Sequence, residues 1–395
     1  MATIAISPPS GIHLAALPPL ALYVHIPWCV RKCPYCDFNS HELRGDLEER
    51  GYIEALIRDL ELSLPSVWGR RVHSIFFGGG TPSLLSAPAI EELLSAFRAL
   101  LPLAADCEIT LEANPGTFEA AKFRAYRASG VNRLSIGVQS FDARHLKALG
   151  RIHDADEARR AIAIAQEHFD NINLDLMYAL PGQNIDEALA DAKAALSFGT
   201  AHLSFYHLTI EPNTLFHRYP PQVPDDDAAG AMQEAIESQL AAAGYMHYET
   251  SAWAKSTRQC RHNLNYWRFG DYLGIGAGAH SKLSFLNRIV RQLRAKQPND
   301  YMRRAAEAAP ILEEHEVSPK DLVFEFMMNA LRLSEGFPVP LFAERTGLAV
   351  TAAEKPLAQA EARGLIVRDH TQVRPTELGR RFLNDLLELF LPERE

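Results

Sequence analysis

Long apolar runs are missing from this 395-residue sequence. No stretch reaches about 18 apolar residues, the length that a membrane-spanning helix needs. The sequence therefore predicts no membrane span, while peripheral contact with a membrane surface stays open. Otherwise the composition, 47% hydrophobic and 23% charged, is that of a globular protein. The length suggests two domains.

Cysteine and positive charge are also scarce. Only five cysteines occur, an odd number, and outside one cluster of three the remaining Cys107 and Cys260 lie far apart. No disulfide framework is indicated, so we expect a reducing, cytoplasmic setting, with peripheral association at the inner membrane as the alternative. The net charge of −9 argues against a nucleic-acid partner.

The first 20 residues contain no Lys or Arg but four prolines. A secretory signal peptide needs a basic start and an unbroken apolar stretch, and this segment has neither. We therefore expect residues 1–20 to form a flexible N-terminal tail.

The richest stretch is 23–38, YVHIPWCVRKCPYCDF, in which Cys29, Cys33 and Cys36 have the spacing CxxxCxxC. An alternating apolar run before it predicts a strand, which Pro27 ends because proline has no N–H for the ladder. The cysteines should then lie on a loop that can gather three thiolates. A structural zinc site, with His25 or His41 completing four ligands, is one interpretation. A 4Fe–4S cluster with one iron left open is the other, and the motifs downstream favour it.

Hydrophobic periodicity predicts alternating strands and helices over the next 220 residues. Strands are expected at Leu22–Ile26, Val72–Phe77, Glu108–Leu111, Arg133–Val138, Ile172–Met177 and Leu203–Ile210. Helices are expected at Tyr52–Leu64, Ile90–Leu101, Phe118–Ser129, Ala155–His168, Ile185–Phe198 and Ala228–Ala243. Such alternation is typical of parallel βα units, whose sites lie at the carboxyl ends of the strands. Polar or glycine positions fall at those ends in the cysteine loop, Gly78–Gly80, Glu112, Gln139 and Asp175.

The pattern changes twice after residue 250. Residues 251–310 are less regular and are interpreted as a connecting segment. Residues 311–395 predict three helices, a hairpin at Leu365–Val367 and Gln372–Arg374, and a last helix, which resembles a winged-helix module. This part carries ten Lys/Arg against fifteen Asp/Glu, a net charge of −5, which opposes DNA binding and favours a lid or docking surface.

CxxxCxxC after a first strand resembles the radical S-adenosylmethionine (SAM) superfamily. More narrowly, YVHIPWCxxxCPYCDF resembles the branch that contains oxygen-independent coproporphyrinogen III oxidase and the HemW-type haem chaperones. The resemblance covers the chain from about Leu20 to its end. It implies an α/β fold, an incomplete (β/α)6 TIM-like barrel over residues 21–250 with a C-terminal winged-helix-like helical domain. It also implies a 4Fe–4S cluster on the three cysteines, which splits SAM into methionine and a 5′-deoxyadenosyl radical.

Matching the family's motifs along this chain assigns SAM contacts at strand ends. The glycine run after the second strand would bind the methionine amino group through Gly79, Gly80 and Thr81. The resemblance implies further SAM contacts from Tyr23, Tyr35, Glu112, Gln139, Arg151 and Asp175, with Arg151 pairing with the SAM carboxylate. Taken singly, each of these residues could have a purely structural role.

His262-Asn-Leu-Asn-Tyr266 resembles the HNxxY signature of the haem chaperones, in which the histidine is associated with haem binding. An imidazole is a normal axial ligand of haem iron, and Tyr266 and Trp267 could cover the macrocycle. The resemblance thus implies haem b as a bound group, with His262 and Tyr266 as its residues and His280 as a second candidate. Respiratory haem apoproteins would be the partners.

The resemblance allows three functions: a haem chaperone, a coproporphyrinogen III dehydrogenase that decarboxylates propionates, and a radical SAM enzyme with an unrelated substrate. True oxidases of this branch carry a further cysteine two residues after the third, where this chain has Phe38. They also tend to have a longer N-terminal extension. Both features favour the chaperone. The radical site looks complete, so enzymatic activity stays open, although coproporphyrinogen oxidase activity is not expected.

Overall fold

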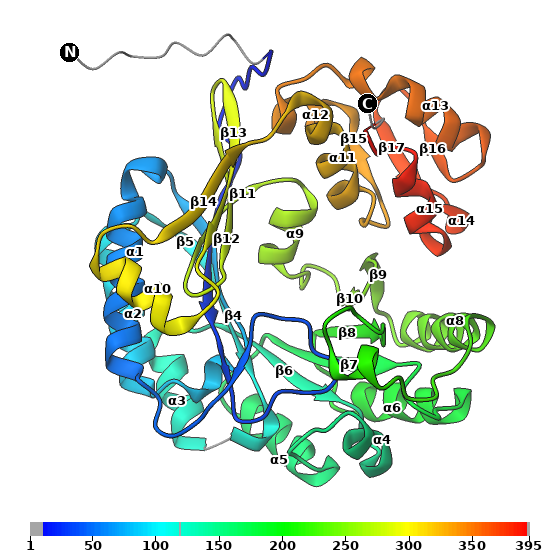
Figure 1. Ribbon diagram of the computed structural model, residues 1–395. Coiled ribbons are helices and arrows are strands. Elements are labelled where there is room, and N and C mark those ends of the chain that lie inside the picture. The colour runs from blue at the N-terminus through cyan, green and yellow to red at the C-terminus, as the bar shows by residue number, and fades with distance from the viewer. Residues whose placement is uncertain (1–10, 118–119, 393–395) are drawn as a thin grey trace.

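A twelve-stranded sheet dominates the computed structural model, which describes residues 11–117 and 120–392. At its centre lie six parallel strands in chain order, joined by helices on the outer face (Figure 1). These strands are β1 (Leu20–Ile26), β4 (Val72–Gly79), β5 (Leu103–Ala113), β6 (Arg133–Gln139), β7 (Ile172–Tyr178) and β8 (His202–His207). The predicted (β/α)6 alternation is confirmed.

The helices that follow these strands match the expected ones to within a few residues. They are α1 (Glu49–Val67), α2 (Ala87–Leu100), α3 (Ala120–Ser129), α5 (Ala155–Gln166), α6 (Ile185–Ser197) and α8 (Asp226–Ala242), with the shorter α4 (Ala143–Ala148) and α7 (Leu215–Arg218). The first two residues of the helix expected at Phe118–Ser129 lie outside the described residues.

Buried aliphatic side chains on the strands explain why the sheet forms. Parallel strands are covered on both faces, so they need nearly continuous apolar sequence. Fully buried members of the resulting core include Val24, Ile75, Leu111, Leu134, Leu174 and Leu203, one on each of the six strands. A glycine or a polar residue ends four of these strands, namely Gly79 on β4, Gln139 on β6, Tyr178 on β7 and His207 on β8.

The expectation of a mere connecting segment at 251–310 is wrong. β11 (Asp271–Ile275) pairs in parallel with β1, and β12 (His280–Phe285), β13 (Arg288–Arg294) and β14 (Ile311–Glu316) extend the same sheet. On the other side, β10 (Ala252–Ala254) and β9 (Met246–Glu249) continue from β8. Of the two helices in this region, α9 (Arg261–Trp267) packs on the concave side of the sheet, and α10 (Pro298–Ala306) packs against α1 on the outside (Figure 1).

The C-terminal domain begins after β14, so the boundary expected at 311 shifts to about 317. It contains α11 (Pro319–Ala330), α12 (Val339–Thr346), α13 (Glu354–Ala362), β15 (Phe337–Pro338), β16 (Ile366–Arg368), β17 (Gln372–Pro375), α14 (Glu377–Arg381) and α15 (Leu383–Glu388). The predicted hairpin is β16–β17, and β15 completes a three-stranded sheet. The single last helix that we expected is two short helices, separated at Phe382.

The expected flexible tail is also wrong for its described part. Ile12 and Leu14 are buried in the core of the C-terminal domain. Their backbone is fixed as well, because His13 N–H donates to Gly347 O at 3.2 Å and Leu14 N–H donates to Leu286 O at 2.9 Å. The apolar side chains of this segment thus find a partner more than 300 residues away in sequence. Residues 1–10 lie outside the described residues.

Candidate functional site

The three motif cysteines lie on a loop that a small pair of strands closes. Cys29 ends β2 (Trp28–Cys29), which pairs with β3 (His41–Glu42). Further backbone bonds tighten the closure, from His41 N–H to Pro27 O at 2.7 Å and from Leu43 N–H to Cys29 O at 2.8 Å. The loop between these strands thus holds Cys33 and Cys36. All three thiols are free and half-buried.

The surroundings of the thiols are partly polar. Burial raises the pKa values of Cys29 and Cys36, and the neighbouring motif cysteines add to both shifts. Two hydroxyl groups oppose these shifts: Thr81 bonds to Cys29, and Ser40 bonds to both thiols. Arg151 Nη1 donates to Cys33 Sγ at 3.7 Å. Within the described residues, no three His, Cys, Asp or Glu side chains are arranged to hold a single metal ion. A cubane cluster is larger and binds each thiolate at a different iron, so the cluster assignment stays a prediction.

A cavity of about 400 Å³ opens beside the cysteine loop, at the carboxyl ends of β4 to β7. It brings together the three cysteines and eight of the nine residues predicted to bind SAM. Those eight are Tyr35, Gly79, Gly80, Thr81, Glu112, Gln139, Arg151 and Asp175. The ninth, Tyr23, lines the adjoining cavity described below.

Two half-buried carboxyl groups, Glu112 and Asp175, face this cavity, and the charge of the buried Arg133 only partly offsets the effect of burial on their pKa values. Burial, then the charge of Asp175, raises the pKa of Glu112 to about 8, although Gly79 N–H donates to its Oε2 at 3.2 Å. Burial also raises the pKa of Asp175, which accepts bonds from Ser135 Oγ at 2.7 Å and Asn173 Nδ2 at 2.8 Å. A positively charged or hydroxyl-rich ligand would stabilise both carboxylates.

Arg151 offers the opposite charge at the cysteine end of the cavity. Its Nη2 donates to Gly137 O at 2.8 Å, and its Nε is buried with no hydrogen-bond partner in the described part of the protein. Burial tends to lower the pKa of this arginine, but Tyr35 and Cys33 beside it raise it overall. The guanidinium is thus held charged and incompletely paired, which suits an anionic ligand group.

The chain at the end of β4 needs glycine because its backbone lies very close to neighbouring segments. Gly79 has φ +114°, and a Cβ at Gly80 would lie 2.4 Å from Trp28 O. Gly80 N–H donates to Ile26 O and Thr81 N–H donates to Trp28 O, both at 2.7 Å. These contacts fix the glycine segment against β1 and β2. Gln139 has φ +68° at the end of β6, a strained conformation for a residue other than glycine and one that recurs at functional sites.

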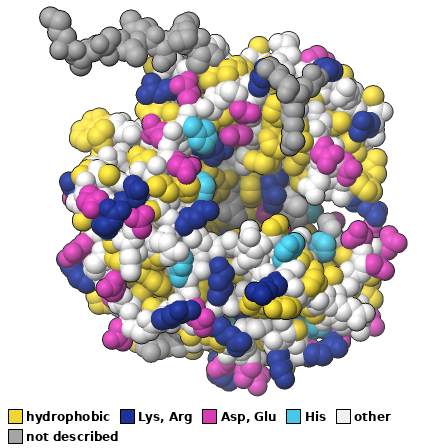
Figure 2. All heavy atoms as spheres, in the orientation of Figure 1, with side chains coloured by type: hydrophobic (Ala, Val, Ile, Leu, Met, Phe, Trp, Pro, Cys, Tyr) yellow, Lys and Arg dark blue, Asp and Glu magenta, His cyan; other side chains and the backbone are white. Residues whose placement is uncertain are grey.

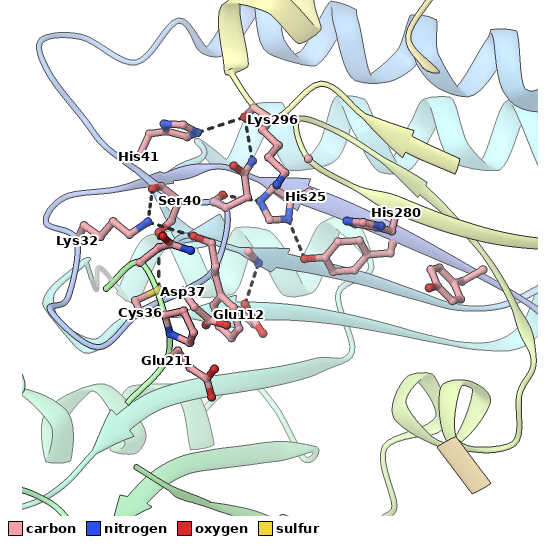
Figure 3. A pocket seen from close by; sticks show the side chains of 18 of the residues that line it. His25, Lys32, Cys36, Asp37, Ser40, His41, Glu112, Glu211, His280 and Lys296 are labelled. Carbon is pink, nitrogen blue, oxygen red and sulfur yellow. Dashed lines mark hydrogen bonds between the residues drawn. The ribbon is translucent and has the colours of Figure 1, made fainter. Parts of the chain in front are cut away.

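A second, wider cavity of about 1000 Å³ adjoins the first. The two share Cys36, Asp37, Phe38, Gly79, Glu112 and Glu211 in their walls. Figure 3 shows the wider cavity, and Figure 2 shows the hollow in the middle of the molecular face, with His, Lys and Arg side chains around it. Its walls come from β1, the cysteine loop, α9, β11 and the start of β12.

The predicted haem residues do not share one environment. Tyr266 lines the wider cavity, but His262 lies behind it and is only 1% exposed. Both ring nitrogens of His262 are bonded, Nδ1 to Ser74 Oγ at 3.0 Å and Nε2 to Tyr266 Oη at 3.1 Å. Burial lowers its pKa to about 3. With both ring nitrogens engaged in this arrangement, His262 does not line the cavity, and its role as axial ligand stays a prediction.

Sequence reasoning missed several residues of the site. Asn39 binds the cysteine loop to the rest of the sheet, because its Nδ2 donates to Ala277 O and to Lys296 O, each at 2.9 Å. Tyr206 donates to Asp175 Oδ1 at 3.4 Å from the end of β8. Glu211, in the Glu-Pro-Asn segment after β8, lines both cavities. Their place just after strands or cysteines was the available signal.

Fold and cysteine loop together define a radical SAM protein, and comparison with known proteins agrees. The Radical SAM superfamily model matches residues 23–195, and the HemN C-terminal domain model matches residues 317–382. The solved structure of coproporphyrinogen III oxidase (HemN) from Escherichia coli, described as a radical SAM enzyme, superposes with a TM-score of 0.81. It covers 95% of this chain and 90% of that one at 23% identity, so it supports the fold alone.

Relatives of higher sequence identity show which family within this superfamily the chain belongs to. A protein of Escherichia coli strain K12 named Heme chaperone HemW is 51% identical over 384 residues, 96% of this chain and 100% of its own. The protein of that name from Haemophilus influenzae is 48% identical over 95% of this chain and 99% of its own. The chain belongs to the HemW family of the radical SAM superfamily. No helix in the described ranges is both long and apolar enough to cross a membrane.

Proposed function

We propose that this protein is a haem chaperone of the radical SAM type. It holds a 4Fe–4S cluster and SAM, binds haem b as cargo and delivers it to respiratory apoproteins, with peripheral contact at the inner membrane during delivery. The observation that carries the proposal is the 51% identity to a protein named Heme chaperone HemW over the full length of that protein.

The cysteine loop fits the cluster that the family implies. Cys29, Cys33 and Cys36 would hold it, since the three thiols lie on one loop and Cys33 is close enough to raise the pKa of both Cys29 and Cys36. When bound, such a cluster supplies single electrons for radical chemistry on SAM. The closure of the loop by β2 and β3, and the bonds of Asn39, keep the thiols beside the smaller cavity.

The smaller cavity fits SAM by charge as well as by position. Arg151, with its unpaired buried Nε, would take the carboxylate of the methionine moiety. Glu112, whose pKa is raised by burial, would become ionised beside the amino group. Gly79, Gly80 and Thr81 bring backbone close to the same end, and Asp175 with Gln139 lies further along the wall, where ribose hydroxyls could bond.

An anaerobic assay separates this proposal from haem synthesis. Cluster-reconstituted protein is incubated with coproporphyrinogen III, SAM and a reductant, and the porphyrins are separated by chromatography beside a known oxidase as positive control. In parallel, the same protein is titrated with haem. We expect haem binding and no decarboxylated product. Catalytic formation of protoporphyrinogen, or failure to bind haem with an intact cluster, would contradict the proposal.

A further inference from the structure

The wider cavity contains one histidine whose ring is unengaged. His25 is buried, with Nδ1 bonded to Tyr23 Oη at 2.9 Å and Nε2 bonded to Asn39 O at 2.8 Å. His41 uses Nε2 on Lys296 O at 3.2 Å. His280 is exposed in the same cavity, and its ring makes no hydrogen bond or ion pair to any described residue. Among the histidines that line this cavity, His280 therefore has both nitrogens available.

A rigid turn holds His280 in place. It is the first residue of β12 and follows Gly276 and Gly278, which have φ +106° and +78°. A Cβ on Gly276 would lie 2.4 Å from His25 O, and one on Gly278 would lie 2.4 Å from Asn39 Nδ2. The turn is thus packed against β1 and the cysteine loop. Such a backbone fixes the direction of the next side chain, as a metal ligand requires.

Aromatic side chains form the wall beside His280. Tyr23, Tyr266 and Tyr272 line the cavity, and the rings of Tyr266 and Tyr272 meet edge to face with centroids 4.5 Å apart. Phe38 lines the cavity from the cysteine loop and is 62% exposed. A flat apolar macrocycle would cover these rings and bury them. The volume, about 1000 Å³, is at the upper end of the range of small-molecule sites, roughly 300–1000 Å³.

Charge in the cavity is divided between two sides. Figure 3 shows Lys296 and His41 on one side, and Asp37, Glu112 and Glu211 toward the other. Lys32 is already engaged, because its Nζ donates to Phe38 O and Ser40 O. The ammonium of Lys296 has no hydrogen bond or ion pair with the described chain and is exposed. An anionic group on the ligand would turn toward Lys296 and away from the carboxylates.

We propose that haem occupies this wider cavity with its iron bound to an imidazole nitrogen of His280 and a propionate near Lys296. This inference rests on the proposed function. His262 is then a positioning residue, because its Nε2 bond to Tyr266 Oη fixes one aromatic wall. The HNxxY motif thus shapes the site, and the iron ligand comes from the Gly-rich segment that ends at His280.

Haem titration of three cluster-loaded variants tests the assignment. His280→Ala should weaken haem binding about tenfold or more and change the spin state seen in the Soret band and by resonance Raman spectroscopy. Added imidazole should restore the wild-type spectrum, because it replaces the lost ligand. His262→Ala should weaken binding while the spectrum of the bound form stays that of wild type. His370→Ala, at an exposed position between β16 and β17 that lines neither cavity, is the control and should bind haem normally.

The outcomes separate the two proposals. If wild type binds no haem, the proposed function fails. If wild type binds haem, but His280→Ala keeps the wild-type spectrum, the His280 assignment is overturned and the proposed function stands. Loss of the spectrum in His262→Ala with rescue by imidazole would make His262 the ligand. Circular dichroism and cluster absorbance establish that each variant is folded, and Lys296→Glu, at an exposed position, should weaken binding several-fold with no spectral change.

Discussion

Burial is the largest single influence on the pKa values of Glu112 and Arg151, larger than that of any one neighbouring group. Glu112 has a neutral carboxyl at pH 7 because burial, with Asp175 beside it, raises its pKa to about 8. Arg151 keeps its charge in the same cavity with one nitrogen unpaired. Such groups destabilise the empty protein and become favourable when a zwitterionic ligand pairs with both.

Glu112 therefore predicts a pH-dependent stability difference. The folded protein holds the proton of Glu112 more tightly than the unfolded chain, whose pKa is near 4.5. This contribution is complete below pH 4.5 and is lost as pH rises to about 8, by at most about 1.4 kcal/mol per pH unit. Glu112→Gln lacks this loss, so in SAM-free protein the melting temperature of the variant should rise relative to wild type from pH 5 to pH 8. A pH-independent difference would show that Glu112 is ionised in the empty site.

Cysteine substitution gives a second prediction at this scale. Cys29→Ser should abolish the visible absorbance of the reconstituted cluster while the circular dichroism spectrum stays unchanged, because the barrel core does not include this loop. Cys107→Ser is the matched control, since Cys107 lies in the middle of β5 and lines neither cavity, and the cluster should form normally in this variant. Persistent cluster absorbance in Cys29→Ser would refute the ligand assignment.

At the scale of elements, the glycine segment after β4 connects the cysteine loop to the smaller cavity. A Cβ at Gly80 would meet the backbone oxygen of Trp28, next to Cys29. Gly80→Ala should therefore move the two segments apart, destabilise the protein by about 1–3 kcal/mol and weaken SAM binding. Gly230→Ala is the control: this helical glycine has nothing within 4 Å of an added Cβ, and alanine should stabilise α8 by roughly 0.5–1 kcal/mol. Calorimetry of unfolding and of SAM binding measures both, and equal effects of the two substitutions would contradict the account.

Much of the central sheet could be predicted from the sequence, because its strands are apolar and alternate with amphipathic helices. The outer strands could not. β11 carries Asp271, buried beside Lys282 Nζ at 3.0 Å and Arg70 Nη2 at 2.8 Å, and it runs into a glycine-rich turn, so its sequence resembles a loop. Hydrophobic periodicity does not reveal a strand that buries paired charges instead of apolar side chains.

The candidate site, like the sheet, could be predicted from the sequence only in part. Eight of the nine residues that motif matching predicted to bind SAM line one cavity, because strand ends in a parallel sheet converge. It could not show that His262 faces inward, since its partner Ser74 lies 188 residues away. Whether a histidine nitrogen is free depends on such distant contacts, which a short motif does not contain.

On the scale of the whole molecule, the N-terminal segment joins the sheet to the C-terminal domain. Leu14 is 1% exposed in the core of that domain, and its N–H donates to Leu286 O in the turn between β12 and β13. Leu14→Ala should lower the free energy of unfolding by about 2–5 kcal/mol. Leu17→Ala, at a position 39% exposed, should change it little. Denaturant unfolding followed by circular dichroism measures both, and similar values would show that the contact contributes nothing.

The central claim is that this protein carries haem to other proteins, and haem transfer tests it most directly. Cluster-reconstituted protein is loaded with one equivalent of haem, freed of excess by gel filtration and mixed with membranes that contain a haem-depleted respiratory apoprotein. We predict that haem leaves the chaperone and that the acceptor regains its characteristic spectrum, faster than with the same amount of haem on serum albumin. Retention of haem by the loaded protein, or transfer no faster than from albumin, would contradict the account.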